Sequence, residues 1–181
     1  MAKLRPFRDY SEHDVNNLFA YDGSSATRGM VVKLDSAKGW KADQVLGTSA
    51  IDNSLANAVS DRHVVQSRVD MCTSGDAPFG ILLYDVAETD ENGEKLLFNP
   101  RKAAEMQTVV SGQAVPILTR GTVLVNGIHN ASVAAAGGSA WALDNGDIGA
   151  RATNTQGTAV KVGTFLGPKS ANGDVLIKLE L

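Results

Sequence analysis

The feature that most constrains the fold of this chain is the alternating stretch from Gln113 to Gly127, QAVPILTRGTVLVNG. Apolar residues share one parity and polar residues share the other: Val115, Ile117, Val123 and Val125 against Arg120, Thr122 and Asn126. Because successive side chains of a strand point to opposite faces of a sheet, this pattern predicts a half-buried strand with a kink at Gly121. Pro116 lacks a backbone donor, so we expect an edge or a bulge at that point. We place this stretch near the middle of an all-β domain.

Shorter segments with strand-like patterns lie on both sides of this stretch. We expect strands at Arg28 to Leu34, His63 to Met71, Phe79 to Val86, Lys95 to Phe98, Thr108 to Val110, Trp141 to Leu143, Val160 to Leu166 and Val175 to Leu181. The run from Phe79 to Val86 is apolar throughout, which is typical of a strand covered on both faces. Asn92-Gly93 and Asn172-Gly173 supply the positive φ angles of tight turns. With 18 glycines and 6% aromatic residues, the composition also favours many short strands joined by turns.

One short helix interrupts this β pattern. Asn99 followed by Pro100 is typical of a helix start, and Arg101 to Met106 has the length of one or two turns. The segment from Trp40 to Asp61 has no sustained period, so we expect irregular structure there, with one short helix as the alternative. The small residues from Ala131 to Ala140 predict a loop.

The first 27 residues differ from the rest of the chain. They have no strand or helix period, yet they hold four aromatic residues among many polar ones. A segment this polar cannot fold alone, whereas aromatic and arginine side chains are typical anchors in protein interfaces. We therefore expect an extended N-terminal arm at residues 1–27 and a β domain at residues 28–181. The arm docks on another subunit in this interpretation; in the alternative, its aromatic side chains fold back onto their own domain.

The sequence offers little for catalysis, cofactors or metals. His13, His63 and His129 are far apart, with no HExxH or CxxC spacing, and no GxSxG motif is present to expose a nucleophile. Cys72 is the only cysteine, and we expect it to be a small buried residue rather than a reactive thiol. The interpretation is a structural or interaction protein with no catalytic, cofactor-binding or metal-binding residues.

Charge and hydropathy exclude two classes of partner. The net charge is −3 with a pI of about 5.6, and the 17 basic residues are scattered along the chain, so we expect no nucleic-acid binding. No apolar run approaches the roughly 20 residues of a membrane span, and the N-terminus lacks the apolar centre of a signal peptide. We expect a soluble protein synthesised in a cytoplasm.

Three segments resemble structural proteins of tailed bacteriophages, especially marine phages. PFRDYSEHDVNNLFAYDG, at Pro6 to Gly23, resembles the N-terminus of virion structural proteins. The segment from Ala77 to Gly127, which contains FGILLYDV and LTRGTVLVNG, is similar to the central part of capsid decoration, or cement, proteins. VGTFLGPKSANGDVLIKLEL, at Val162 to Leu181, is similar to their closing segment. The resemblance covers about half of the chain, and Asp35 to Asp61 has no counterpart in it.

This resemblance implies a small β-tulip or β-barrel-like fold and a non-enzymatic head-stabilising protein on the capsid exterior of the virion, made in the host cytoplasm. Its partners would be the major capsid protein and further copies of itself, as a trimer or, in the alternative, a dimer. We expect the arm residues that contact capsid or subunit to be Arg5, Phe7, Arg8, Tyr10 and Phe19. The alternative structural role is a minor tail, baseplate or vertex module, and the alternative class is a glycan-cleaving or cell-wall hydrolase of the virion.

Overall fold

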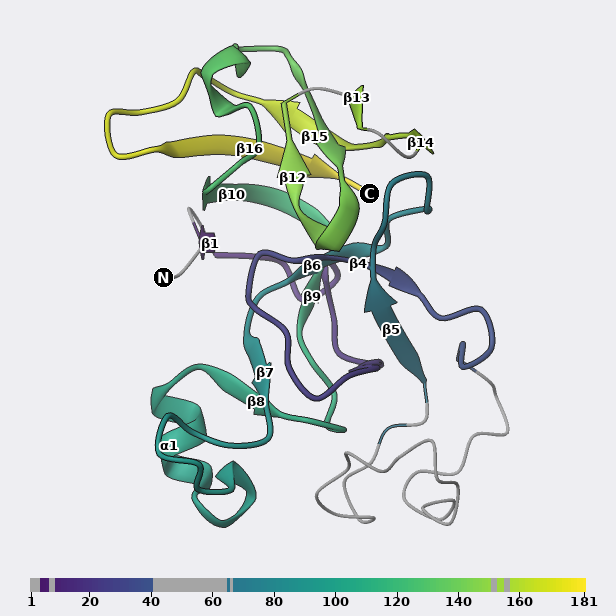
Figure 1. Ribbon diagram of the computed structural model, residues 1–181, viewed down its shortest axis with the longest axis vertical. Coiled ribbons are helices and arrows are strands. Elements are labelled where there is room, and N and C mark those ends of the chain that lie inside the picture. The colour runs from purple at the N-terminus through teal and green to yellow at the C-terminus, as the bar shows by residue number, and fades with distance from the viewer. Residues whose placement is uncertain (1–3, 7–8, 41–64, 66, 151–152, 155–156) are drawn as a thin grey trace.

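The computed structural model describes residues 4–6, 9–40, 65, 67–150, 153–154 and 157–181 (Figure 1). Its described residues form mostly β-strands with one short α-helix, and the sheets curl into a half-barrel. The all-β prediction is therefore confirmed. The interpretation of Trp40 to Asp61 lies, apart from Trp40, outside the described residues, as do His63 and Val64 at the start of one predicted strand.

The upper sheet of Figure 1 has six strands in the order β1-β10-β16-β15-β11-β12. All its neighbouring strands are antiparallel. The strands are β1 (Leu4–Pro6), β10 (Arg120–Asn126), β16 (Asp174–Glu180), β15 (Val160–Phe165), β11 (Ser139–Ala142) and β12 (Ile148–Gly149). The predicted C-terminal strand is thus confirmed, and it pairs along its whole length with β10 near the centre of the sheet.

The lower sheet also has six strands, in the order β2-β9-β6-β4-β5-β3. They are β2 (Val15–Asn16), β9 (Ile117–Leu118), β6 (Gly80–Leu82), β4 (Val31–Leu34), β5 (Arg68–Met71) and β3 (Ala20–Tyr21). Only the β3 to β5 pairing in this sheet is parallel among the described strands. Its two outer strands, β2 and β3, both come from the N-terminal 27 residues.

The stretch from Gln113 to Gly127 crosses from one sheet to the other. It forms β9 in the lower sheet and β10 in the upper sheet, with Thr119 between them. The Thr119 backbone nitrogen donates a hydrogen bond to the Asp14 carbonyl at 2.9 Å, next to β2, and its carbonyl accepts one from the Leu181 nitrogen at 3.3 Å, next to β16. Gly121 has φ +149°, a value that glycine adopts most easily, so the predicted kink falls at this residue. The predicted single strand is therefore two strands that join the sheets.

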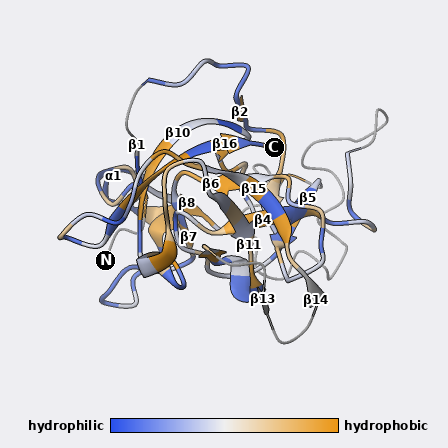
Figure 2. Ribbon diagram, turned by 90° about the horizontal axis from the view of Figure 1, so that it is seen from above, coloured by the Kyte–Doolittle hydropathy of each residue, from blue (hydrophilic) through white to orange (hydrophobic). Residues whose placement is uncertain are grey.

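The core lies between the two sheets. One cluster combines inward residues of the upper sheet with residues of the lower sheet: Val123, Val125, Ile177, Leu179 and Phe165 with Val31, Ile81 and Leu118. A second cluster fills the far side of the lower sheet. Ile81 and Leu82 are neighbours that point in opposite directions, and both are fully buried, so the predicted two-sided burial is confirmed for β6. The predicted single strand from Phe79 to Val86 is wrong, because the chain bends at Leu83 and Tyr84, and Tyr84 is 42% exposed. Seen from above, the apolar colour is concentrated along the strands rather than in the peripheral loops (Figure 2).

An insertion in the chain between strands β6 and β9 carries the helix at the lower left of Figure 1. It contains β7 (Asp85–Ala87), the 3-10 helix η3 (Leu96–Phe98), α1 (Pro100–Glu105) and β8 (Thr108–Val110), and β7 pairs with β8 in parallel. The predicted helix and the predicted strand at Thr108 are confirmed. The expected strand from Lys95 to Phe98 is wrong, because only Thr89 and Lys95 form a bridge before the chain turns into η3.

Four further short elements are described. They are η4 (Ala131–Val133), η5 (Asp144–Gly146), β13 (Thr153–Asn154) and β14 (Gly157–Thr158). Strand β11 begins at Ser139, inside the segment expected to be a loop. Among the described residues, no helix is long and apolar enough to cross a membrane.

Candidate functional site

The N-terminal segment, which carries all five predicted contact residues, is incorporated in both sheets. It supplies β1 to the edge of the upper sheet and both edge strands of the lower sheet. Phe7 and Arg8 lie outside the described residues, so the structure places three of the five: Arg5, Tyr10 and Phe19. These three do not form one cluster. They lie at the upper sheet edge, over β10 and in the lower core, respectively.

Strand β1 is held by one buried side chain and one ion pair. Leu4 is buried in the core beside Val125, its partner in the ladder. Arg5 points outward, with 58% of its side chain exposed, and its guanidinium donates to the carboxylate of Asp174. Asn126, followed by Arg5, lowers the pKa of the Asp174 carboxyl, so this carboxylate is charged at neutral pH. Three residues and these contacts fix the strand to the sheet.

Tyr10 covers the kink of β10. A Cβ atom added at Gly121 would lie 3.0 Å from the Tyr10 ring, which shows how closely the two residues approach. The Tyr10 hydroxyl donates to the Thr122 carbonyl at 3.4 Å. The ring is half-buried, so part of it lies at the surface.

Phe19 belongs to the core of its own chain. Its side chain is 6% exposed, and its ring meets Phe79 edge to face with centroids 5.3 Å apart. Tyr21, two residues on, is 7% exposed in the same cluster. At this position the structure has the folded-back arrangement, which was the alternative to docking on another subunit.

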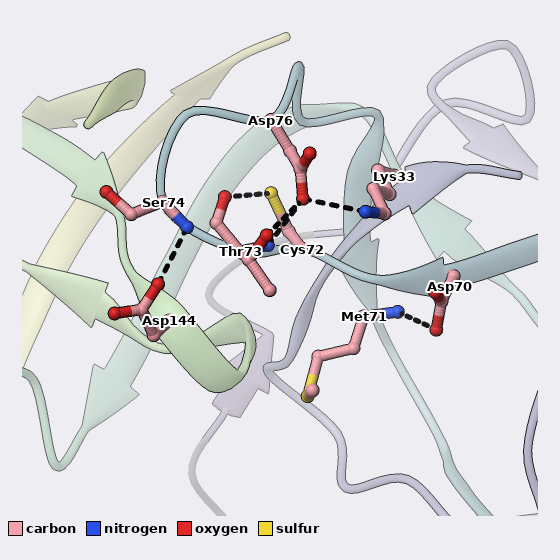
Figure 3. Close-up of polar contacts among 8 residues, drawn as sticks. All are labelled: Lys33, Asp70, Met71, Cys72, Thr73, Ser74, Asp76 and Asp144. Atoms are coloured by element: carbon pink, nitrogen blue, oxygen red, sulfur yellow. Dashed lines mark hydrogen bonds and ion pairs between the residues drawn. The ribbon is translucent and has the colours of Figure 1, made fainter. Parts of the chain in front are cut away.

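A polar cluster ties the turn after β5 to the lower sheet (Figure 3). The Asp76 carboxylate accepts hydrogen bonds from Lys33 Nζ at 2.8 Å and from the hydroxyl and backbone nitrogen of Thr73 at 2.6 and 2.8 Å. Partial burial raises the pKa of Asp76, but the hydrogen bonds from Lys33 and Thr73 outweigh it and lower the pKa to about 2. The neighbouring Ser74 backbone nitrogen donates to Asp144 at 2.9 Å. The hydrogen bonds to Asp76 and Asp144 hold the turn after β5 in place.

Cys72 is buried at the centre of this cluster. It is fully enclosed in the main core, and burial raises the pKa of its thiol to about 11. A thiol with that pKa carries almost no thiolate at neutral pH and is therefore a poor nucleophile. The prediction of a small buried residue is confirmed.

The described residues contain no group of three or more His, Cys, Asp or Glu side chains arranged to hold a metal ion. The His129 ring contacts the Asp147 carboxylate at 3.2 Å on the surface.

Two surface regions were not predicted from the sequence. The first, here called the basic sheet face, is the outward side of β10, β16 and β15, where Arg120, Lys161 and Lys178 surround Glu180. The Lys178 ammonium donates to Glu180 at 2.6 Å, and this bond, with the charges of Lys161 and Arg120, lowers the pKa of the Glu180 carboxyl. These residues are up to 60 positions apart in the chain, so only the strand pairing brings them together.

The second region, here called the acidic insertion, comprises residues 85–107. It carries six carboxylates against three basic side chains. Asp90 is buried and holds the tip, accepting hydrogen bonds from the backbone nitrogens of Asn92 and Glu94 and from Lys102. Beside this tip, Phe98 is 79% exposed and Tyr84 is 42% exposed. In the sequence, Phe98 follows two leucines that come directly after the charged residues Glu94 and Lys95.

The comparison with protein families decides what kind of molecule this is. The model of the family described as structural cement protein (E217 gp24/Pam3 gp6) matches residues 9–181. The chain belongs to this family. No curated protein matches it significantly. As a phage structural cement protein, it is a component of the virion that binds capsid components, and the resemblance to capsid decoration proteins is confirmed.

Proposed function

We propose that this cement protein binds the outer surface of the capsid and stabilises it by bridging neighbouring major capsid subunits, without any catalytic step. The observation that carries the proposal is the N-terminal edge of the upper sheet, where β1 is attached by three residue pairs and presents a largely exposed arginine. An edge strand has free backbone groups on its outer side, and these groups can pair with a strand of a partner. A ligand that binds only the assembled lattice opposes its rupture by mass action.

The arm residues have different roles in this proposal. Arg5, Phe7, Arg8 and Tyr10 contact the capsid, since Arg5 is exposed and Tyr10 is half-buried beside β1. Phe19 is buried against Phe79, so we expect it to anchor the arm to its own domain rather than to touch the capsid. We also infer that the protein assembles as a homo-oligomer, with a trimer favoured over a dimer.

A truncation tests the arm. A chain that lacks residues 1–8 loses β1, Phe7 and Arg8 but keeps Phe19 and the core that surrounds it. We expect it to remain folded and to sediment with expanded capsids far less than the full chain does. The matched control is Val133→Ser, which changes an exposed apolar residue of η4 outside the arm, the basic sheet face and the acidic insertion. Undiminished binding by the truncated chain would refute the arm assignment.

Copy number tests the location. Quantitative mass spectrometry of purified virions should give this chain in a simple lattice ratio to the major capsid protein. A few copies per particle would instead place it in the tail, baseplate or vertex, and would overturn the bridging proposal.

A further inference from the structure

The basic sheet face has an apolar row beside its charges. Leu124 and Leu176 are opposite each other in the β10 to β16 ladder, on the outward side. Leu166, 46% exposed, continues the row, since its backbone nitrogen donates to the Leu176 carbonyl at 2.9 Å. On the far side of the charges, Trp141 pairs with Lys161 across β11 and β15 and is half-buried. This face therefore combines apolar side chains, a tryptophan and an excess of positive charge, which is typical of an interface rather than of a purely solvated sheet.

The acidic insertion has the complementary properties. Glu91 and Glu94 are exposed at its tip, and Glu91 has only a 3.4 Å contact with Lys102 to balance it. Phe98 projects from η3 beside a groove of about 260 Å³ that is lined by Tyr84, Leu97 and Pro100. A largely exposed phenylalanine next to carboxylates matches an apolar row next to basic side chains in both charge and hydropathy.

We propose that the acidic insertion of one copy docks on the basic sheet face of a second copy. Phe98 would lie over the row of Leu124, Leu166 and Leu176, while Glu91 and Glu94 would face Arg120 and Lys161. The basic sheet face and the acidic insertion lie at opposite ends of the molecule, with the upper sheet at one end and α1 at the other (Figure 1).

The two docking surfaces are different, so the contact is head to tail. Head-to-tail contacts either close into a ring or extend into a filament. A closed ring of three is the form that agrees with the trimer proposed above. The contact joins only copies of this chain, so it can be tested without capsids. Its failure would leave the proposal of capsid binding untouched.

The test is charge exchange between the two surfaces, followed by analytical ultracentrifugation of the full chain. It is done below 0.1 M salt, where the screening length is about 10 Å or more. We expect wild-type protein to associate reversibly. We expect Arg120→Glu with Lys161→Glu, and separately Glu91→Lys with Glu94→Lys, to weaken association by about tenfold or more. Mixing the two double variants should restore pairwise association, because each offers the charge that the other lacks. It should not restore a closed ring of three, since favourable contacts join unlike variants and three positions cannot alternate between two kinds of chain.

Controls separate this contact from general charge effects and from misfolding. Asp9→Lys with Glu12→Lys makes the same charge change at exposed arm positions and should associate like wild type. Phe98→Ser leaves all charges in place and should also weaken association, while thermal unfolding shows that each variant is folded. A wild-type protein that stays monomeric at all concentrations, double variants that associate like wild type, or a mixture that fails to recover would each overturn the proposal.

Discussion

Gly163 lies opposite Leu179 in the ladder of β15 and β16. A Cβ atom at this position would lie 2.3 Å from the carbonyl oxygen of Lys178, which is backbone and cannot turn away. We therefore expect Gly163→Ala to lower the free energy of unfolding by about 1 to 3 kcal/mol, the range of strain from overpacking in a core. Urea unfolding followed by circular dichroism measures this change.

Gly167→Ala is the matched control. Gly167 follows the same strand, and an added Cβ there would meet no atom within 4 Å. We expect its free energy of unfolding to change by less than about 0.5 kcal/mol. Equal losses of stability at the two positions would show that the close approach of β15 to β16 is not the reason why Gly163→Ala is destabilising.

Asp76 gives the fold a defined sensitivity to acid. Its pKa is about 2 in the folded protein, below the ordinary value of 3.8. Stability from a carboxylate with a lowered pKa is fully present above the unfolded pKa, and it is lost as the pH falls through the folded pKa. Because 28% of the side chain is exposed, screening reduces the contribution to about 1 kcal/mol.

Asp76→Asn should therefore cost about 1 kcal/mol at pH 6 and progressively less between about pH 4 and pH 2. Urea midpoints of both proteins across that range measure the difference. Asp9→Asn removes an exposed carboxylate of the arm and serves as the control. A difference between Asp76→Asn and wild type that stays constant down to pH 2 would contradict this account.

Cys72 and Phe19 show which buried residues the sequence can predict and which it cannot. The burial of Cys72 could be predicted because it ends an apolar alternation and has no charged neighbour in the chain. The position of Phe19 could not, because an aromatic side chain in a polar segment looks the same whether it meets its own core or a partner. Only the pairing of β3 with β5, which brings Phe19 to Phe79, distinguishes the two.

At the scale of elements, alternation predicts strands well wherever one face is buried. Strands β15 and β16 were predicted close to their observed positions, because each buries one side against the core and exposes the other. The division of the Gln113 to Gly127 stretch between two sheets was not predictable. Alternation continues on both sides of Thr119 although the chain changes sheet there.

The insertion shows a different limit. Lys95 to Phe98 follows a tight turn and was expected to return as a strand. The chain instead continues into η3, where Leu96 is buried and Phe98 faces outward. A segment of four residues is too short for alternation to distinguish a strand from a turn of helix.

Strand β1 should act as a separable element. It pairs only with β10, through three residues, whereas β10 also pairs with β16 through seven. In the chain that lacks residues 1–8, we expect the β10 amides that point toward β1 to exchange hydrogen about tenfold or more faster. Amides shared by β10 and β16 should keep their protection.

Hydrogen exchange with mass spectrometry on the full and truncated chains measures this effect. Amides of β8 in the distant insertion serve as the internal control. Loss of protection throughout the upper sheet would show instead that β1 is needed for the fold of the whole sheet.

At the scale of the whole molecule, the sequence predicted the class of protein better than it predicted the docking surfaces. Three segments sufficed to indicate a cement protein, and the family match covers residues 9–181. The basic sheet face could not be predicted, because Arg120, Lys161 and Lys178 are scattered in the sequence and become neighbours only through the order β10-β16-β15. A chain with net charge −3 thus has one basic face and one acidic end.

Capsid stabilisation by this chain should follow the law of mass action. If the protein binds the expanded lattice and not its separated subunits, each tenfold increase in free protein above the dissociation constant adds about 1.4 kcal/mol per site. The rupture temperature of capsids lacking cement protein should therefore rise with the logarithm of added protein, as measured by scanning calorimetry. The chain without residues 1–8 is the control and should need a far higher concentration for the same rise. If the full chain sediments with capsids but leaves their rupture temperature unchanged, binding occurs without bridging.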